Sequence, residues 1–230
     1  MNKGIVYYTD SQLNDKYAIP VRKQLDKVNL PIVSVSLQPL DWGDNIYLDL
    51  ERGYLTMFKQ ILAGLKKTNS DVVFFAEHDI LYHPSHFDFI PERDDTFYYN
   101  QNVWKVDAKS SKCLHYLCSQ TSGLCAYRNL LLDHYERRVD YVEKNGFSRK
   151  IGFEPGTHKR IPKLNGISDV WMSEFPNIDI RHDKNLTLSR WRKDQFRNQK
   201  YTKGWIECDT ISGWGKVFGE FDNILENILR

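Results

Sequence analysis

Apolar residues in the first part of the chain recur with two different periods. Residues 4–8 (GIVYY) and 31–39 (PIVSVSLQP) are short runs of aliphatic, β-branched and aromatic residues, a pattern typical of buried strands. Between the two runs, apolar residues fall at helical spacing: Ala18, Val21, Leu25 and Val28. The chain therefore starts with a predicted strand, a helix and a second strand.

A second unit of the same kind follows. Residues 52–67 (RGYLTMFKQILAGLKK) give the clearest helical pattern, because six apolar residues share one face: Tyr54, Leu55, Phe58, Ile61, Leu62 and Leu65. Residues 71–76 (DVVFFA) then form an apolar run that predicts a third buried strand. Strands that alternate with helices predict an α/β fold with parallel strands.

Polar residues directly follow two of these predicted strands. Thr9 and Asp10 come after the first strand, and Glu77, His78 and Asp79 come after the third. Ligands of open α/β sheets bind at the carboxyl ends of parallel strands, so both groups should meet at one edge of the sheet. We expect a functional site at that edge.

The pattern changes in the second half of the chain. Residues 96–107 and 112–120 are aromatic, strand-like segments that indicate mixed or antiparallel pairing, and residues 122–144 predict a strand followed by a helix. Residues 145–215 show little periodicity, whereas residues 216–230 end in an amphipathic helix. Together these elements predict one domain with a mixed sheet flanked by helices.

The composition agrees with one folded domain. The chain has 230 residues, of which 41% are hydrophobic and 13% aromatic, enough for a core of its own. No run of eighteen apolar residues predicts a transmembrane helix. The cysteines lack paired spacing, which favours reduced core thiols over a disulfide frame or a zinc site: Cys113, Cys118, Cys125 and Cys208. These features predict a cytoplasmic protein.

The acidic residues after the third strand suit a divalent cation. Mg²⁺ and Mn²⁺ prefer oxygen ligands and commonly bridge one or two carboxylates to substrate phosphates. Glu77 and Asp79 could instead cap a helix or pair with a surface cation. His78 is interpreted as an imidazole packed between strands, and His83 and His86 as loop or cap residues.

The order of these elements, with Thr9–Asp10 after the first strand and an acid-x-acid motif after the third, resembles a GT-A glycosyltransferase of the family 2 type. In that fold a D-x-D motif holds a metal ion on the diphosphate of a nucleotide sugar. The resemblance covers residues 1–185 and makes Asp79 the expected ligand of Mn²⁺ or Mg²⁺. Glu77 is a second ligand or faces the ribose or donor sugar. His182, after a strand-like segment, resembles the family's third ligand; its alternative is a surface histidine.

The resemblance also implies a catalytic base between the two metal motifs. Residues 152–160 (GFEPGTHKR) supply Glu154, which glycine and proline residues can fix at the edge of a pocket. Asp169, expected to cap a short helix, is the second candidate, and Glu174 lies in the same stretch. Such a base removes the proton of an acceptor hydroxyl in an inverting sugar transfer.

Donor-binding residues are expected on both sides of the acid motif. By the resemblance, Thr9, Asp10 and Arg52 would contact a nucleotide sugar, with a UDP-sugar favoured, and Asn102 and Trp104 would line the pocket of its sugar. Helix-surface packing is the alternative for Arg52, and core packing is the alternative for Trp104. Residues 1–107 would then form the donor-binding half, and residues 108–185 the acceptor-binding half.

The net charge is concentrated near the C-terminus. Residues 149–203 contain thirteen Lys or Arg and six Asp or Glu, so this segment has a charge of +7, and the whole chain has only +2. Cations interleaved with aromatic rings are typical of nucleic-acid grooves, and they predict acceptor contacts at Arg190, Trp191 and Arg192. Residues 186–230 are thus a basic segment with a C-terminal helix. A solvated surface is the alternative.

Several functions remain open at this point. The chain could resemble bacteriophage enzymes that transfer sugar to 5-hydroxymethyl pyrimidines in DNA, in which case it would act in the host cytoplasm. A bacterial glycosyltransferase of surface polysaccharide or of a lipid carrier is the competing version. A nucleotidyltransferase or a metal-dependent hydrolase would also place acids at strand ends, although YYTDSQLNDK lacks the Gly-rich loop of the former.

Overall fold

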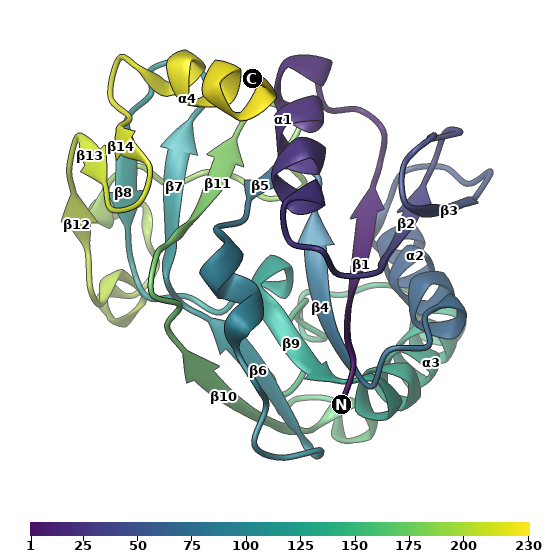
Figure 1. The fold of residues 1–230 in the computed structure, drawn as a ribbon. Coiled ribbons are helices and arrows are strands. Elements are labelled where there is room, and N and C mark those ends of the chain that lie inside the picture. The colour runs from purple at the N-terminus through teal and green to yellow at the C-terminus, as the bar shows by residue number, and fades with distance from the viewer.

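The computed structural model describes residues 1–230 and contains two mixed β-sheets and four α-helices (Figure 1). The larger sheet has seven strands in the spatial order β10 (Ile167–Trp171), β6 (Thr96–Asn100), β9 (Leu124–Tyr127), β4 (Val72–Glu77), β1 (Lys3–Thr9), β2 (Ile32–Ser36) and β3 (Asp44–Tyr47). The strands β1 to β4 are mutually parallel, and β9 runs antiparallel to both β4 and β6. The predicted mixed α/β sheet is therefore confirmed.

A smaller sheet lies beside the first. Its five strands are, in order, β12 (Ile206–Glu207), β8 (Cys113–His115), β7 (Val103–Asp107), β11 (Asn177–Arg181) and β5 (Ile80–Leu81). A hairpin of β13 (Thr210–Ile211) and β14 (Gly215–Lys216) follows it in the chain. The short strand β5 pairs with β11 directly after the acid motif, so the chain passes from one sheet to the other at that motif.

The helices cover the large sheet on both faces. The four are α1 (Asp15–Asp26), α2 (Tyr54–Lys67), α3 (Arg128–Asn145) and α4 (Phe221–Leu229). Alternate residues of β1 show the layering, since Val6 and Tyr8 pack in one core cluster with α2 and α3, and Ile5 and Tyr7 in another with α1 and α4. Figure 1 shows α1 and α4 side by side, away from α2 and α3.

Gly64 sets the distance between α2 and the sheet. A Cβ atom at this position would lie 2.5 Å from Cγ1 of Val6 on β1, so only glycine permits the close approach. The helix is amphipathic as predicted, with Phe58, Ile61 and Leu65 buried. Its tight packing holds the preceding residues, including Arg52, near the carboxyl end of β1.

One edge strand is not among the predicted elements, and one sequence interpretation is wrong. Asp44–Tyr47 form the edge strand β3, which pairs with β2. Asp169 does not cap a helix, because it lies in β10, an edge strand paired with β6. Residues 145–215 contain mostly short elements, in agreement with their weak periodicity. Every helix is too short or too polar to traverse a lipid bilayer.

The basic segment packs on the smaller sheet. Phe196 is buried with Leu114 and Tyr116 in a small cluster, and the rings of Trp205 and Tyr116 stack at 5.7 Å. The strand β12 then joins the sheet by pairing with β8. The aromatic residues of this segment therefore anchor it to the fold, while most of its cations are exposed.

Candidate active site

The carboxyl ends of β1 and β4 lie next to each other. These parallel strands pair with Tyr8 opposite Glu77, so Thr9 and Asp10 emerge beside His78 and Asp79. The Nδ1 atom of His78 lies 3.8 Å from Oδ1 of Asp10. The two polar groups that follow the predicted strands therefore meet at one edge, as expected.

A pocket opens at this edge. Its empty space, including the part open to solvent, is about 910 Å³. Six residues singled out in the sequence line it: Thr9, Asp10, Arg52, Glu77, Asp79 and Glu154. Residues 120–122 and 184–187 complete much of the wall. The pocket therefore combines the strand ends with three segments from the second half of the chain.

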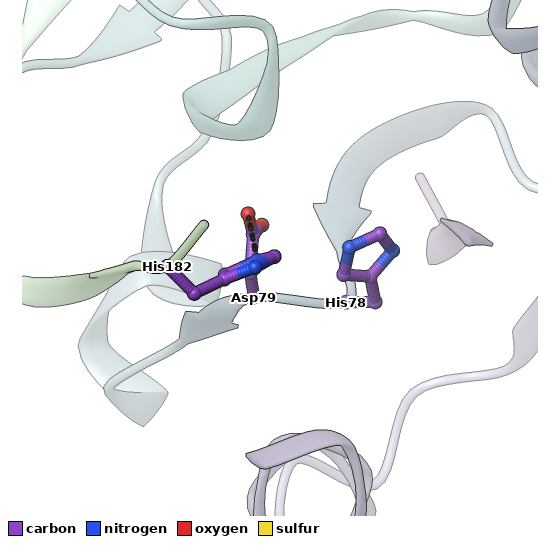
Figure 2. A group of neighbouring side chains, drawn as sticks. All are labelled: His78, Asp79 and His182. Carbon is purple, nitrogen blue, oxygen red and sulfur yellow. Dashed lines mark ion pairs between the residues drawn. The ribbon is translucent and has the colours of Figure 1, made fainter. Parts of the chain in front are cut away.

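His78, Asp79 and His182 form the tightest cluster of potential ligands. Figure 2 shows the three side chains together, with His78 and Asp79 following β4 and His182 following β11. One potential ligand atom from each residue lies within 4.8 Å of the others, and Nε2 of His182 is 3.5 Å from Oδ2 of Asp79. Asn185 donates a hydrogen bond of 2.6 Å to the same carboxylate oxygen.

The cluster fits a divalent cation. Nδ1 of His78 is buried without a hydrogen-bond partner, which leaves a lone pair or a proton unsatisfied in the protein alone. Burial alone would raise the pKa of Asp79, yet His182, His78 and Arg181 lower it below its ordinary value, so this group is an anion. One carboxylate with two imidazoles suits Mn²⁺ better than Mg²⁺, which prefers oxygen ligands only.

Glu77 lies apart from this cluster. Its Oε1 atom accepts a hydrogen bond of 2.5 Å from the hydroxyl group of Tyr8. Burial and the neighbouring Asp79 raise the pKa of Glu77 to about 8, which favours the protonated acid at neutral pH. A role of Glu77 as a metal ligand stays a prediction, and its structural partner is Tyr8.

Arg52 bridges two sides of the pocket. It precedes α2 by two residues, and its Nε atom lies 2.5 Å from Oδ2 of Asp10. Its guanidinium group also donates to the carbonyl oxygen of Lys184. Lys184 in turn donates a hydrogen bond of 2.9 Å to the carbonyl oxygen of Gln12. The segment after β11 is thereby connected to the loop after β1.

Glu154 is held in a fixed loop at the pocket wall. Gly152 and Gly156, on either side of it, have φ angles of +68° and +77°, which other residues rarely adopt. The hydroxyl group of Tyr99 donates a hydrogen bond of 2.6 Å to the carbonyl oxygen of Pro155. Burial raises the pKa of Glu154 above its ordinary value, which suits a general base.

A buried polar network supports the pocket from behind. Asp179, with 1% exposure, accepts a hydrogen bond of 2.9 Å from Gln120 and pairs with Arg181 at 3.4 Å and Lys105 at 3.6 Å. Gln120 and Arg181 also line the pocket. Arg181 also lowers the pKa of the neighbouring Asp79, so the network connects the back of the pocket electrostatically to the cluster of potential metal ligands.

Several predicted site residues lie outside this pocket. Asn102 donates a hydrogen bond of 2.8 Å to the carbonyl oxygen of Ser173, and Trp104 packs against the ring of His115. Asp169 is exposed on the edge strand β10. The acceptor candidates lie on the segment that continues from the pocket wall at Thr187: Arg190, Trp191 and Arg192.

The structure also brings in residues that sequence reasoning missed. His78, interpreted from the sequence as a packing residue, lies in one cluster of potential metal ligands with Asp79 and His182. Its position between Glu77 and Asp79 is the sequence feature that could have indicated this role. Asn185 contacts Asp79, but an amide in a polar loop gives no pattern of its own. These contacts arise because β11 ends beside β5 and therefore beside the acid motif.

No protein-family description and no curated protein sequence matches the chain. Among solved structures, it is similar to a glycosyltransferase involved in the glycosylation of the major capsid of PBCV-1, with a TM-score of 0.50 at 9% identity, over 78% of this chain and 92% of that chain. The chain has a GT-A-type glycosyltransferase fold.

Two weaker likenesses of this GT-A-type chain have TM-scores below 0.5. S. aureus TarS 1-349 matches with a TM-score of 0.47 at 12% identity, over 78% of this chain and 60% of that chain. Drosophila β1,4-galactosyltransferase 7, in a complex with manganese, UDP-Gal and xylobiose, matches with a TM-score of 0.42 at 9% identity, over 89% and 83%.

The cluster of His78, Asp79 and His182 predicts one Mn²⁺ site. In calorimetric titrations, Asp79→Asn and His182→Ala should each weaken Mn²⁺ binding by more than about 100-fold. Removing a residue that only forms a hydrogen bond to a metal ligand typically weakens metal binding by about 10- to 100-fold, so a larger loss indicates a direct ligand. His158→Gln changes a histidine outside the cluster and is the control. Unchanged Mn²⁺ affinity in Asp79→Asn would refute the assignment.

Proposed function

We propose that the protein is a glycosyltransferase that moves a sugar, with inversion, from a nucleotide-sugar donor to an acceptor hydroxyl group. The observation that carries the proposal is that His78, Asp79 and Glu154 line one pocket of a GT-A-type fold, with His182 3.5 Å from Asp79. A UDP-sugar is the favoured donor. Residues 1–107 would supply most donor contacts, and residues 108–185 most acceptor contacts.

The pocket offers groups for each part of the donor. Thr9 and Asp10 lie at the end of β1, where they can contact the nucleoside, and Arg52 is bound to Asp10. Arg181 and Lys184 line the same pocket as cations for the diphosphate. A divalent cation held by His78, Asp79 and His182 would stabilise the negative charge of the leaving nucleoside diphosphate.

Glu154 is the proposed general base. It would take the proton of the acceptor hydroxyl as that oxygen bonds to the anomeric carbon, while the bond from this carbon to the diphosphate oxygen breaks. The base must be ionised, and burial raises its pKa. The rate of transfer should therefore fall as the pH decreases through this raised pKa, at a higher pH than for an ordinary glutamate.

Two exposed basic segments beside the pocket support an anionic acceptor. Residues 149–163 have five exposed cations and Glu154 as their only acid. Residues 190–203 have six exposed cations, and the only acidic residue among them, Asp194, pairs with Arg192 at 3.1 Å. The acceptor we propose is a 5-hydroxymethyl pyrimidine in DNA, rotated out of the duplex into the pocket. The competing acceptor is a polysaccharide or lipid carrier.

The donor class can be tested by a hydrolysis and binding screen. We expect slow, Mn²⁺-dependent hydrolysis of one nucleotide sugar from a panel of UDP-, GDP- and dTDP-sugars, measured by release of the nucleoside diphosphate. The Asp79→Asn variant is the control and should release none above background. Absence of binding and turnover for every member of the panel would refute the transferase proposal and favour a nucleotidyltransferase or hydrolase.

Glu154→Gln should separate transfer from donor binding. Loss of a general base lowers the rate of transfer by about 10² to 10⁴-fold, while the affinity for the donor stays within a few-fold. Asp169→Asn, on the exposed strand β10, is the matched control and should keep the wild-type rate. If Glu154→Gln retains transfer and Asp169→Asn loses it, the base is Asp169.

The DNA acceptor predicts salt-dependent binding. Fluorescence anisotropy should show tighter binding of duplexes that contain 5-hydroxymethyl pyrimidines than of unmodified duplexes, and the affinity should fall as salt rises. The Lys159→Gln/Arg160→Gln variant should lower the slope of log affinity against log salt by about two. Lys23→Gln/Lys27→Gln, at the C-terminal end of α1, is the charge-matched control. Salt-independent or absent DNA binding would exclude this acceptor and favour the carbohydrate or lipid carrier.

A further inference from the structure

Arg138 is a buried cation whose hydrogen-bond partners are all neutral. It lies on α3 with 1% exposure. Removing a guanidinium group from water costs several kcal/mol unless an opposite charge or a full set of hydrogen bonds compensates. The groups around Arg138 must therefore compensate for the loss of its hydration.

The partners of Arg138 lie directly before Glu154. Its Nη1 atom donates hydrogen bonds of 2.9 Å to the carbonyl oxygen of Gly152 and 3.1 Å to that of Phe153. Two consecutive carbonyl groups therefore share one end of a planar guanidinium group. This contact fixes the backbone that leads into Glu154 from the α3 side, while Tyr99 on β6 donates to the carbonyl oxygen of Pro155, directly after Glu154.

The other end of the guanidinium group is also held. Its Nε atom donates a hydrogen bond of 3.1 Å to Nε2 of His134, one helical turn earlier. Burial and Arg138 lower the pKa of His134 to about 2, so the imidazole is neutral and accepts the hydrogen bond. The rings of Phe58 and Tyr135 lie 5.0 and 5.7 Å from the guanidinium carbon, within the range of cation–π contacts.

We propose that Arg138 is a positioning residue for the base of the reaction: it fixes the loop that carries Glu154 through the carbonyl groups of Gly152 and Phe153, and so holds its positive charge beside that loop. The inference rests on the proposed function, in which Glu154 is the base. Lysine could supply the charge, but its single nitrogen cannot bind the two carbonyl groups and His134 from two separate positions, as Nη1 and Nε of Arg138 do. A neutral side chain could fill the volume but would supply no charge.

The charges around Glu154 support this role. The titratable groups that influence it from the protein side include Arg138 and Tyr135 on α3, Tyr99 on β6, and Cys118 after β8, while the charged Asp79 and Arg181 line the same pocket. Burial raises the pKa of Tyr99, Tyr135 and Cys118 above their ordinary values, so these three are neutral at neutral pH. Arg138 is positively charged, and it opposes the rise that burial causes in the pKa of Glu154.

The first test does not depend on transfer. The pKa of Glu154 can be followed by ¹³C NMR of the labelled side-chain carboxyl group in the 230-residue chain, with Glu154→Gln to assign the signal. Arg138→Met should raise this pKa, because a positive charge that lowers it is removed. Arg138→Lys should return it toward the wild-type value. An unchanged pKa in Arg138→Met would overturn the proposal whether or not the protein transfers sugar.

The second test measures transfer and donor affinity together. Arg138→Met should lower kcat by about 10 to 100-fold and leave the donor Kd unchanged, and the acid limb of its pH profile should move to higher pH. Arg138→Lys should restore the limb but only part of kcat, since the second anchor of the side chain, at His134, is lost. Arg137→Met, at a partly exposed position one residue earlier, is the control and should behave as wild type.

A double-mutant cycle separates positioning from a general effect on folding. In the Glu154→Gln background, Arg138→Met should cost little further activity, because the group that Arg138 serves is already lost. An equal loss in both backgrounds, or a weaker donor Kd in Arg138→Met, would assign Arg138 a structural role and overturn the proposal. Full transfer by Glu154→Gln alone would instead refute the base assignment in the proposed function.

Discussion

The parallel pairing of β1 with β4 is the constraint on which the rest of the pocket depends. It places Tyr8 opposite Glu77, so the polar residues that end each strand emerge side by side. A shift of one residue in this pairing would turn every side chain of one strand to the opposite face. The two core clusters prevent such a shift, because successive residues of β1 are buried in different layers.

The sequence predicts this central part well because its pattern is local. The apolar runs before Thr9 and Glu77 and the apolar face of α2 are each contained in fewer than twenty residues, and the structure confirms all three. His182 is predicted as a metal ligand only from the resemblance, because a strand-like segment that ends in histidine is compatible with many functions. The remaining contacts depend on β5 pairing with β11, two elements a hundred residues apart, and no local pattern encodes that pairing.

The sequence pattern does not reveal the positions of Asp169 and Arg138, for two different physical reasons. The strand β10 lies at the edge of the sheet, where four of its five residues are exposed, so it lacks the alternation that identifies a half-buried strand. Asp169 was therefore interpreted as a helix cap. Arg138 was overlooked for the opposite reason, because a cation in an amphipathic helix is normally expected at its surface, whereas here it lies in the interior.

The loop of Glu154 and the segment after Thr187 differ from the strand ends in how they can evolve. Both are irregular and are joined to the fold at a few anchored points, such as Tyr99 to Pro155 and Phe196 in its aromatic cluster, and most residues after Thr187 are exposed. Surface loops tolerate insertions and exchanges far better than sheet strands do. Under the proposed function, exchanges in the segment after Thr187 and at positions flanking Glu154 would change the acceptor, while Glu154 itself and the cluster of His78, Asp79 and His182 are retained.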